Sequence, residues 1–436
     1  MEEQNPWWTG EEDRTYERWK RYGVKWIPDI VERMSFRPFS FHFLVGPRQV
    51  GKTTALKICI QNLIKQRDPK SVFYYSCDEL SDYRELGEVL DNYLAARKEW
   101  GINDSILFLD EITFVEDWWR AVKFRIDSGA FRRDVLVVTG SASIELLGEK
   151  ERFPGRRGDG EDIYLPPMDF AEYAQKLGGV TTKRAPVRDL GAVEKSARAN
   201  ALYAVKLSEL FQRYLKTGGF PVPVREFFEE GKISLESKKT YLDWLKSDWK
   251  KAGKSDGYMK GVLSYILRTR LAPVSWLGIA KETSIGSPHT AQSYVECLED
   301  LLAVRALDII APDFKVLYRK NKKIHVLDPF LYQVFSYYTG EEVLEETVVE
   351  SVVASHLARV FETYFWRNGS EVDVVSVVGK KQVGFEVKWG PKSWRKPRHL
   401  KQVFLLSKEN LPLFLSSTSW QPEPSHADSS AMQGQG

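Results

Sequence analysis

The sequence predicts an α/β protein in which a parallel β-sheet domain is followed by a helical region and a smaller α+β domain. Five short apolar runs alternate with helical patterns up to about residue 175, and continuous apolar strands of this kind belong to parallel sheets covered on both faces. From about residue 176 helical patterns take over. A chain of 436 residues is also too long for one ordinary domain.

Composition narrows the class of protein. No apolar run approaches the roughly 18 residues that span a bilayer, so we expect no membrane partner and a cytoplasmic location. The three cysteines form no CxxC pair, which argues against a disulfide framework or a zinc site. The net charge of +3 neither requires nor excludes a nucleic-acid partner.

The first two predicted segments are an N-terminal preface and the sheet domain. Residues 1–39 are rich in Trp, Arg and Glu and are expected to form a helical preface packed on the next domain. The sheet domain is expected over residues 40–175. Its strands are predicted at Phe43–Val45, Ser71–Ser76, Ile106–Leu109, Val135–Thr139 and Ile163–Leu165.

A phosphate-binding motif follows the first of these strands. The residues from Gly46 to Thr53 fit the pattern GxxxxGK[ST], with a helical pattern after them. In such a P-loop, glycines let backbone N–H groups turn toward phosphate oxygens and the helix N-terminus adds partial positive charge. Lys52 is expected to reach the β- and γ-phosphates. The predicted ATP-binding residues are Gly46, Pro47, Arg48, Gln49, Val50, Gly51, Lys52, Thr53 and Thr54.

Two adjacent carboxylates end the strand Ile106–Leu109. We expect Asp110 and the Thr53 hydroxyl to hold Mg²⁺, and Glu111 to orient and polarise the attacking water. Together with the P-loop, this pair predicts hydrolysis as well as binding of ATP.

Two further positions are candidates for catalysis. Ser141 or Thr139, at the tip of the next strand, could contact the γ-phosphate, the alternative being an ordinary turn. Arg156, in the run from Phe153 to Gly158, could stabilise developing phosphate charge. The alternative for Arg156 is a basic surface turn. The predicted catalytic set is therefore Lys52, Glu111, Ser141 and Arg156.

A helical connector is predicted over residues 176–265, interrupted by the GGFP run at residues 218–221, and a winged-helix-like domain over 266–335. The second prediction rests on a short helix, Trp276–Lys281, a turn, and an amphipathic helix, Thr290–Val304. Two strand-like pieces then flank a basic stretch that contains Lys315, Arg319, Lys320, Lys322 and Lys323. Such a domain binds DNA or serves as a protein docking module.

The last domain is predicted over residues 336–416, before a Ser/Gln/Pro/Gly-rich tail, 417–436, that we expect to be disordered. Glu350 lies in a helix, and Asp373, Glu386 and Lys388 lie on two neighbouring strands. This order resembles the core of PD-(D/E)XK nucleases. The resemblance implies a metal site at Glu350, Asp373 and Glu386, with Lys388 activating water. The alternative is a degenerate fold in which these charges neutralise one another.

A basic stretch continues beyond these strands. Residues 380–401 contain eight Lys or Arg and one acid, interleaved with tryptophan. This composition suits phosphate contact and base stacking, the alternative being a solvated loop.

The motifs as a set resemble a prokaryotic, notably archaeal, family of AAA-type P-loop ATPases. The resemblance rests on GPRQVGKTT, LDEI, TGSAS, PGRRG and LPPMDFAEY, and it covers residues 6–173. It implies a sheet with an extra strand between the two Walker strands. The GGFP run and Val326-Leu327-Asp328 look like the family's C-terminal region, which ends in a restriction-endonuclease-like fold. Thr113 departs from the family, which commonly has Gln there, and no sensor-2 arginine is evident.

Three hypotheses about function follow. In the first, ATP turnover is coupled to binding or metal-dependent cleavage of DNA or RNA. In the second, the chain is a nucleotide-controlled switch whose C-terminal half binds nucleic acid or protein without cutting. The third is a signalling scaffold that contacts no nucleic acid. A homo-oligomer is compatible with each of them.

Overall fold

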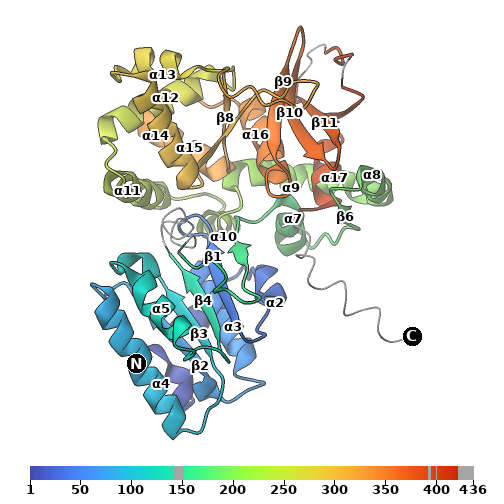
Figure 1. The fold of residues 1–436 in the computed structure, drawn as a ribbon. Helices are drawn as coiled ribbons and strands as arrows, with labels where there is room; N and C mark the ends of the chain where they lie inside the picture. The colour runs from blue at the N-terminus through green and yellow to red at the C-terminus, as the bar shows by residue number, and fades with distance from the viewer. Residues whose placement is uncertain (141–151, 391–393, 399, 421–436) are drawn as a thin grey trace. The chain divides into compact units, whose positions relative to one another are not determined.

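The computed structural model describes residues 1–140, 152–390, 394–398 and 400–420, which form two compact units (Figure 1). Unit 1 contains Met1–Met168, Phe220–Ala252 and Asp300–Leu302. Unit 2 contains Asp169–Gly219, Gly253–Glu299 and the chain from Ala303. The segment predicted as one connector, 176–265, is therefore divided between the units.

Unit 1 is built on a five-stranded parallel sheet in the order β2-β3-β4-β1-β5. The strands are β1 (Ser40–Val45), β2 (Val72–Ser76), β3 (Ile106–Asp110), β4 (Val135–Thr139) and β5 (Asp162–Tyr164). All five predicted strands are present with small shifts at their ends. Strand β4 lies between β1 and β3, which carry the two Walker motifs. The expected P-loop NTPase arrangement, with a strand between the Walker strands, is confirmed.

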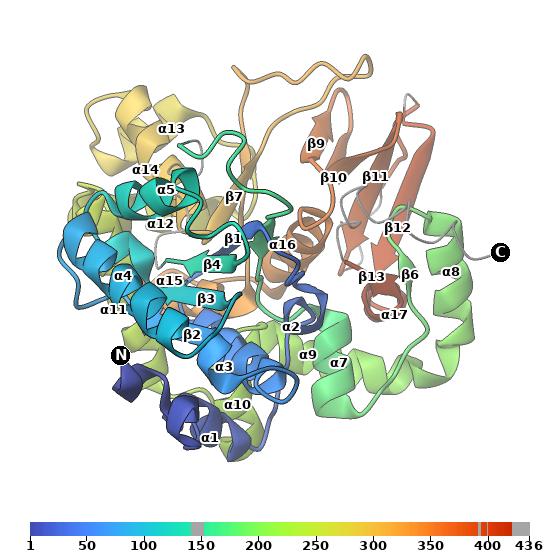
Figure 2. The same cartoon turned by 60° about the horizontal axis from the view of Figure 1, so that its bottom comes forward.

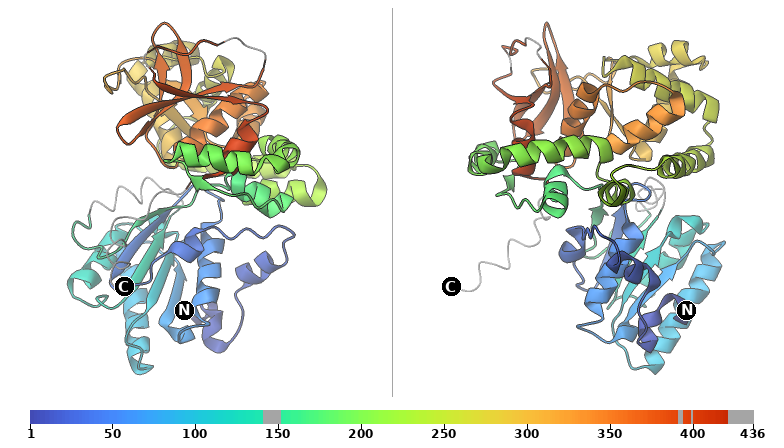
Figure 3. Two further views of the ribbon diagram at one scale, coloured as in Figure 1. Left: turned by 90° about the vertical axis from the view of Figure 1, so that its right-hand side faces the viewer. Right: turned by 180° about the vertical axis from the view of Figure 1, so that it is seen from behind.

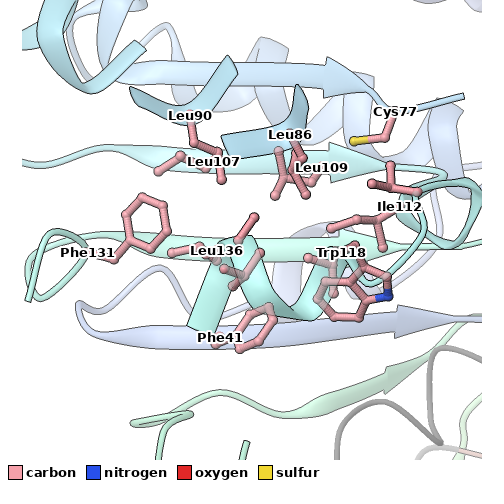
Figure 4. Close-up of a cluster of buried hydrophobic side chains, with 14 of the residues drawn as sticks. Phe41, Cys77, Leu86, Leu90, Leu107, Leu109, Ile112, Trp118, Phe131 and Leu136 are labelled. Atoms are coloured by element: carbon pink, nitrogen blue, oxygen red, sulfur yellow. The ribbon is translucent and has the colours of Figure 1, made fainter. Parts of the chain in front are cut away.

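Helices cover both faces of this sheet (Figures 1 and 2). Helices α4 (Tyr83–Glu99) and α5 (Trp118–Asp127) pack on one face, while α3 (Lys52–Leu63) lies on the other with α1 (Arg14–Lys20) and α2 (Ile30–Arg33). Alternate strand residues meet α4 and α5 in a cluster that includes Phe41, Leu107 and Leu136 (Figure 4). This apolar layer fixes the strand ends on which the motifs sit.

The N-terminal preface protects the edge strand β2. It begins with two 3₁₀ turns, η1 (Glu2–Gln4) and η2 (Pro6–Thr9). The Asn5 side chain accepts a hydrogen bond from the Tyr74 N–H at 2.7 Å and donates to the Tyr74 carbonyl at 2.9 Å. The Trp7 and Trp8 indoles both donate to the Val72 carbonyl, each at 3.0 Å. These side chains thus form hydrogen bonds with backbone groups of β2 that could otherwise pair with another strand.

Two helices from the middle of the chain also belong to unit 1. They are α10 (Pro221–Glu230), which starts with Pro at its first position, and α11 (Leu235–Lys251), which is capped by the Ser234 hydroxyl at 3.0 Å from the Ser237 N–H. Trp249 on α11 is fully buried. These two helices complete the unit that carries the P-loop.

Unit 2 contains a helical part and a mixed sheet, seen from two further sides in Figure 3. The sheet has the order β12-β11-β10-β9, from β9 (Thr363–Arg367), β10 (Glu371–Val378), β11 (Lys381–Lys388) and β12 (Gln402–Ser407). Only the pair β11–β12 is parallel. The described helices are α7 (Phe170–Gly178), α8 (Leu190–Ala199), α9 (Ala204–Thr217), α12 (Asp256–Thr269), α13 (Trp276–Thr283), α14 (Pro288–Asp300), α15 (Pro329–Thr339), α16 (Glu345–Leu357) and α17 (Leu411–Ser416).

Helices α13 and α14 are followed by an antiparallel hairpin, β7 (Val304–Leu307) and β8 (Lys323–Val326). Val274, just before α13, forms an antiparallel bridge with Lys322. The loop between the hairpin strands, residues 308–322, is called the wing below. Its Ile309 also bridges Phe365 of β9, so the wing extends one edge of the four-stranded sheet.

The two glycines of the GGFP run have a structural explanation within unit 2. Gly218 has φ 62° and ψ −160°, a region open essentially to glycine alone. A Cβ added there would lie 1.8 Å from Asp328 Oδ1. The Asp328 carboxylate accepts hydrogen bonds from the N–H groups of Gly219 and Phe330, both at 2.8 Å. The glycines therefore allow a buried acid to cap α15 and hold the chain beside it.

The C-terminal end of the described chain is more ordered than predicted. Thr418–Ser419 form β13, which pairs with β6 (Ala185–Pro186), and Trp420 is buried against Phe414. The expectation of disorder was thus wrong for 417–420, because apolar packing and backbone pairing hold them, and residues 421–436 lie outside the described residues. In the described part of the chain, no helix is long and apolar enough to cross a membrane.

Candidate functional site

The predicted ATP-binding residues form the turn after β1 and the start of α3. In order they are Gly46, Pro47, Arg48, Gln49, Val50, Gly51, Lys52, Thr53 and Thr54. A Cβ on Gly46 would lie 2.4 Å from the Leu165 carbonyl oxygen, which leaves no room for a side chain. Gly51, with φ 99°, precedes α3 in the left-handed region. The two motif glycines are therefore required for different reasons, close packing and backbone conformation.

Lys52 is held over the P-loop. Its Nζ donates to the carbonyl oxygens of Gly46 at 2.9 Å and Pro47 at 3.3 Å. Burial lowers the pKa of Lys52, and the charges of Glu111 and Asp110 oppose this effect. The ammonium group is thus placed in a water-poor environment, where its attraction for an anion is stronger than at the surface.

Asp110, at the end of β3, is the centre of a hydroxyl network. Its Oδ2 accepts hydrogen bonds from Thr53 Oγ1 at 2.6 Å and from the Tyr74 hydroxyl at 2.9 Å. Its Oδ1 accepts one from Thr139 Oγ1 at 2.8 Å. Asp110 is 1% exposed. The structure thus brings together the two predicted magnesium ligands, Thr53 and Asp110, and adds Tyr74, which sequence reasoning missed.

Thr139 and Ser141 were the two candidates at the tip of β4. Thr139 contacts Asp110 directly, as described above. Ser141 lies outside the described residues. In the parallel pairing of β3 with β4, Leu109 is opposite Val138, so the next residues, Asp110 and Thr139, lie side by side with their side chains on the same face.

Glu111 follows Asp110 in an unusual backbone conformation. Its φ of 53° and ψ of 36° are left-handed, which is uncommon for a residue with a side chain. It precedes the short turn η4 (Ile112–Phe114). Thr113 in that turn packs on Gly140, where an added Cβ would lie 2.5 Å from Thr113 Cγ2. The strained position at Glu111 is consistent with a functional constraint.

Helix α11 packs beside the P-loop. Arg48 Nε lies 3.2 Å from Asp248 Oδ2, and both side chains are largely buried. The Tyr241 hydroxyl reaches the Gln49 carbonyl at 3.5 Å. Lys251 lies over the Phe114 ring, 4.5 Å from its centroid. No motif spacing pointed to this helix, because its residues lie about 190 positions after the P-loop.

Arg156 lies elsewhere in unit 1. Its Nε is 2.6 Å from Asp127 Oδ1 at the end of α5. The neighbouring Arg157 donates to the Phe41 carbonyl near the start of β1 and pairs with Asp162 at 2.8 Å. The P-loop follows the opposite end of β1. Within one chain, therefore, the structure does not bring Arg156 together with Lys52 and Asp110.

A second cluster of charges lies in unit 2, at the predicted nuclease-like residues. Lys323 of β8 is 2% exposed on its side chain and its Nζ lies among three carboxylates. The distances are 2.8 Å to Glu371 Oε1, 2.9 Å to Glu350 Oε1 and 3.2 Å to Asp373 Oδ1. Sequence reasoning assigned Lys323 to a basic surface stretch and did not connect it with these acids. We call these four residues the carboxylate centre.

The remaining predicted residues adjoin this centre. Lys388 Nζ lies 2.5 Å from Glu386 Oε1, and Asp373 Oδ2 accepts the Val387 N–H at 2.9 Å. Burial raises the pKa of Glu350 to about 7, opposed by Lys323, and burial also raises the pKa of Glu386 to about 7. Burial alone would lower the pKa of Lys323, but the charges of Glu350, Asp373 and Glu371 raise it overall.

The arrangement of the carboxylate centre can be compared with the metal site predicted at Glu350, Asp373 and Glu386. Within residues 1–140, 152–390, 394–398 and 400–420, no group of three or more His, Cys, Asp or Glu side chains is arranged to hold a metal ion. Glu350 and Asp373 do converge, as predicted, but they converge on the Lys323 ammonium group.

Basic and aromatic side chains are exposed on the wing. Tyr318 is 71% and Phe314 is 45% exposed, and Lys315, Arg319 and Lys320 are exposed as well. Lys322, in contrast, is buried and donates to Asp308 and to the Tyr318 carbonyl. The second basic stretch, 380–401, is only partly described. There Trp394 donates to the Glu371 carbonyl at 3.2 Å and Trp389 to Glu345 at 2.6 Å.

The chain matches two family models. Residues 39–174 match the model described as "AAA domain". This matched segment has the P-loop NTPase fold. It contains the P-loop, Asp110, Glu111 and Thr139. Residues 208–341 match the model described as "Domain of unknown function (DUF8612)".

Among curated proteins, the chain is 27% identical over 197 residues to the uncharacterized protein MJ1637 of Methanocaldococcus jannaschii. That match covers 42% of this chain, and the chain spans 38% of the length of this relative. This relative is an archaeal protein.

Solved structures give weaker likenesses. The Aeropyrum pernix ORC2 protein in ADPNP and ADP complexes is 13% identical with a TM-score of 0.38, covering 69% of this chain and 88% of that one. The Thermotoga maritima RuvB Holliday junction branch migration motor is 14% identical with a TM-score of 0.29, covering 72% and 92%. The Aeropyrum pernix ORC1 protein in complex with DNA is 15% identical with a TM-score of 0.29, covering 71% and 89%.

Proposed function

We propose that this protein binds and hydrolyses ATP with Mg²⁺ at the P-loop of its AAA domain, and that the nucleotide state controls nucleic-acid binding by unit 2. The observation that carries the first part is the network around Asp110. A buried carboxylate, two threonine hydroxyls and a buried lysine converge at the ends of β1, β3 and β4. This donor set fits a magnesium–nucleotide complex, because Mg²⁺ prefers oxygen ligands and few protein ligands.

Each residue has a defined task in this proposal. The N–H groups of the P-loop and Lys52 bind the phosphates, and Thr53 with Asp110 would hold Mg²⁺, which neutralises phosphate charge. Thr139 keeps Asp110 oriented. Glu111 orients the attacking water, since it follows Asp110 directly at the strand end. Arg156 would need a second copy of the chain to act at this site, so we propose its catalytic role only for a homo-oligomer.

The wing supports nucleic acid as the partner of unit 2. Together with α13, α14 and the β7–β8 hairpin it resembles a winged helix. The exposed side of α14 carries Glu296 and no Lys or Arg, which disfavours phosphate contact by that helix. The wing presents Lys315, Arg319 and Lys320 next to two exposed aromatic rings. Such a surface combines phosphate contacts with base stacking.

We propose that binding occurs without cleavage. Cleavage by a PD-(D/E)XK centre would need a metal ion beside Glu350 and Asp373, and the ammonium group of Lys323 lies at that position. This observation favours the nucleotide-controlled switch over the nuclease among the hypotheses that the sequence leaves open.

An ATPase assay with and without single-stranded DNA, duplex DNA and RNA tests the proposal. We expect Lys52→Ala to abolish turnover and Glu111→Gln to retain bound ATP without hydrolysing it. Nucleic acid should bind with different affinity to the Glu111→Gln protein in ATP and in ADP. Unchanged turnover in Lys52→Ala would refute the site. Equal affinity in ATP, in ADP and without nucleotide would refute the switch and favour a scaffold that works through proteins.

A further inference from the structure

We infer that the Lys323 ammonium group serves as the permanent cation of the carboxylate centre, so that this centre does not bind a divalent metal ion. The lysine side chain takes the place of a metal ion and joins the β7–β8 hairpin to α16 and β10. The inference concerns unit 2 alone and holds whether or not the P-loop hydrolyses ATP.

The distances fit an ammonium group and not a metal ion. The three carboxylate oxygens lie 2.8, 2.9 and 3.2 Å from Nζ, which is the range of N–H···O hydrogen bonds. Oxygens around Mg²⁺ lie at about 2.0–2.1 Å and around Ca²⁺ at about 2.3–2.6 Å. A metal ion at the same point would require the three side chains to close in by roughly 0.7–1.2 Å for Mg²⁺ and roughly 0.2–0.9 Å for Ca²⁺.

The number of carboxylate oxygens that face Lys323 Nζ also equals the number of hydrogen-bond donors on a lysine ammonium group. An ammonium group has three donors and no acceptor, and Lys323 faces one oxygen each from Glu350, Glu371 and Asp373. The second oxygen of Asp373 accepts the Val387 N–H at 2.9 Å. The oxygens that face Nζ are therefore already engaged, and a metal ion bound to them would have to displace Lys323.

Displacement of Lys323 is costly because of where the residue lies. It is in a strand paired with β7, its side chain is buried, and the next residue outward, Lys322, is bridged to Val274. Removing the ammonium group from its partners would leave three acids facing one another in a region of low dielectric. The carboxylate centre thus connects the β7–β8 hairpin to the sheet. Two of the acids that resemble the PD-(D/E)XK pattern, Glu350 and Asp373, bind Lys323 in place of a metal ion.

Manganese binding to the full chain tests the inference. In the absence of nucleotide and in an Asp110→Asn background, which removes the P-loop carboxylate, we expect no bound Mn²⁺ by electron paramagnetic resonance. Lys323→Met in the same background should gain a single bound Mn²⁺ per chain, and adding Asp373→Asn should remove it. Lys322→Met is the matched control, since it removes a buried lysine from the same hairpin but not from the carboxylate centre, and it should gain none.

Two results would overturn the inference. The first is Mn²⁺ bound to the chain with Lys323 intact and lost with Asp373→Asn, because the centre would then hold metal beside the lysine. The second is a folded Lys323→Met protein that gains no ion. Thermal melting covers the case in which Lys323→Met folds poorly: Mn²⁺ should raise its melting temperature, as expected for a ligand of the native state, and leave that of Lys322→Met unchanged. No rise in the Lys323→Met protein would also contradict the inference.

Discussion

At the residue scale, the orientation of Asp110 depends on side chains from two other strands and one helix. Thr53, Tyr74 and Thr139 all donate to its carboxylate. Binding of Mg²⁺ through Thr53 would change the partner of Oδ2, whereas Thr139 donates to Oδ1. Thr139 is therefore the contact that we expect to persist when nucleotide binds.

We predict that Thr139→Val lowers kcat for ATP hydrolysis by about tenfold or more, the usual effect of removing a group that orients a metal ligand. Valine keeps the shape of threonine but leaves Oδ1 of Asp110 without this donor. Steady-state ATPase kinetics check the prediction, and Thr139→Ser, which keeps a hydroxyl, is the control that should retain most activity. A Thr139→Val protein as active as Thr139→Ser would show that the contact is not needed.

Residue-level predictions from sequence succeeded where a motif fixes the spacing. The convergence of Thr53 with Asp110 was predictable, because a P-loop and an acidic strand end in one parallel sheet meet at the same edge. The partnership of Lys323 with Glu350, Glu371 and Asp373 was not predictable, since the residues are 27 to 50 positions apart and lie on three elements. A basic run in the sequence does not reveal that two of its lysines are buried.

At the element scale, the start of α15 contains an acid with a strongly perturbed pKa. Burial raises the pKa of Asp328 to about 6, although hydrogen bonds from Gly219 and Phe330 act in the opposite direction. The folded chain therefore binds the Asp328 proton more tightly than the unfolded chain does. Its contribution to stability is full at pH values below about 4 and is lost as the pH rises through 6.

We predict that Asp328→Asn removes part of the pH dependence of stability. A pKa raised by about two units corresponds to about 3 kcal/mol of unfolding free energy. Urea unfolding at pH 4.5 to 7.5 should show wild-type stability falling relative to the variant by an amount of this order. Asp189→Asn, which changes an exposed helix cap in the same unit, should leave the wild-type slope unaltered. A constant difference across this range would contradict the prediction.

The wing gives a second prediction at the scale of an element. Arg319→Ala and Lys320→Ala should each weaken nucleic-acid binding and reduce the slope of log affinity against log salt by about one. Fluorescence anisotropy at several salt concentrations measures both quantities. Lys206→Ala, an exposed lysine of α9 outside the wing, is the control. Unchanged salt slopes in both wing variants would exclude phosphate contact there.

The elements themselves were more predictable than their partners. The five strands of unit 1, and the helix and two strands that carry Glu350, Asp373 and Glu386, follow from apolar periodicity. The bridge from Ile309 to Phe365, which joins the wing to β9, and the pairing of β6 with β13 leave no such signal. Short pairings between distant segments depend on tertiary packing and not on local pattern.

At the scale of the whole molecule, the chain passes between its units more than once. It leaves unit 1 after Met168, returns at Phe220 and leaves again after Ala252. The sequence suggested consecutive domains, because the strand pattern gives way to helical patterns near residue 176 and no motif in α11 links it to the P-loop. The burial of Trp249 and the pairing of Arg48 with Asp248 explain why the returning segment belongs to unit 1.

This interleaving means that the matched stretch 39–174 is not a complete folding unit, which matters for dissecting the protein into fragments. A fragment of residues 1–168 would lack the contacts that Tyr241 and Asp248 make with the P-loop. We predict that it unfolds at lower temperature than a fusion of 1–168 to 220–252 through a flexible linker, measured by circular dichroism. Equal melting temperatures would contradict this. A boundary drawn from the motifs alone would therefore yield an unstable fragment.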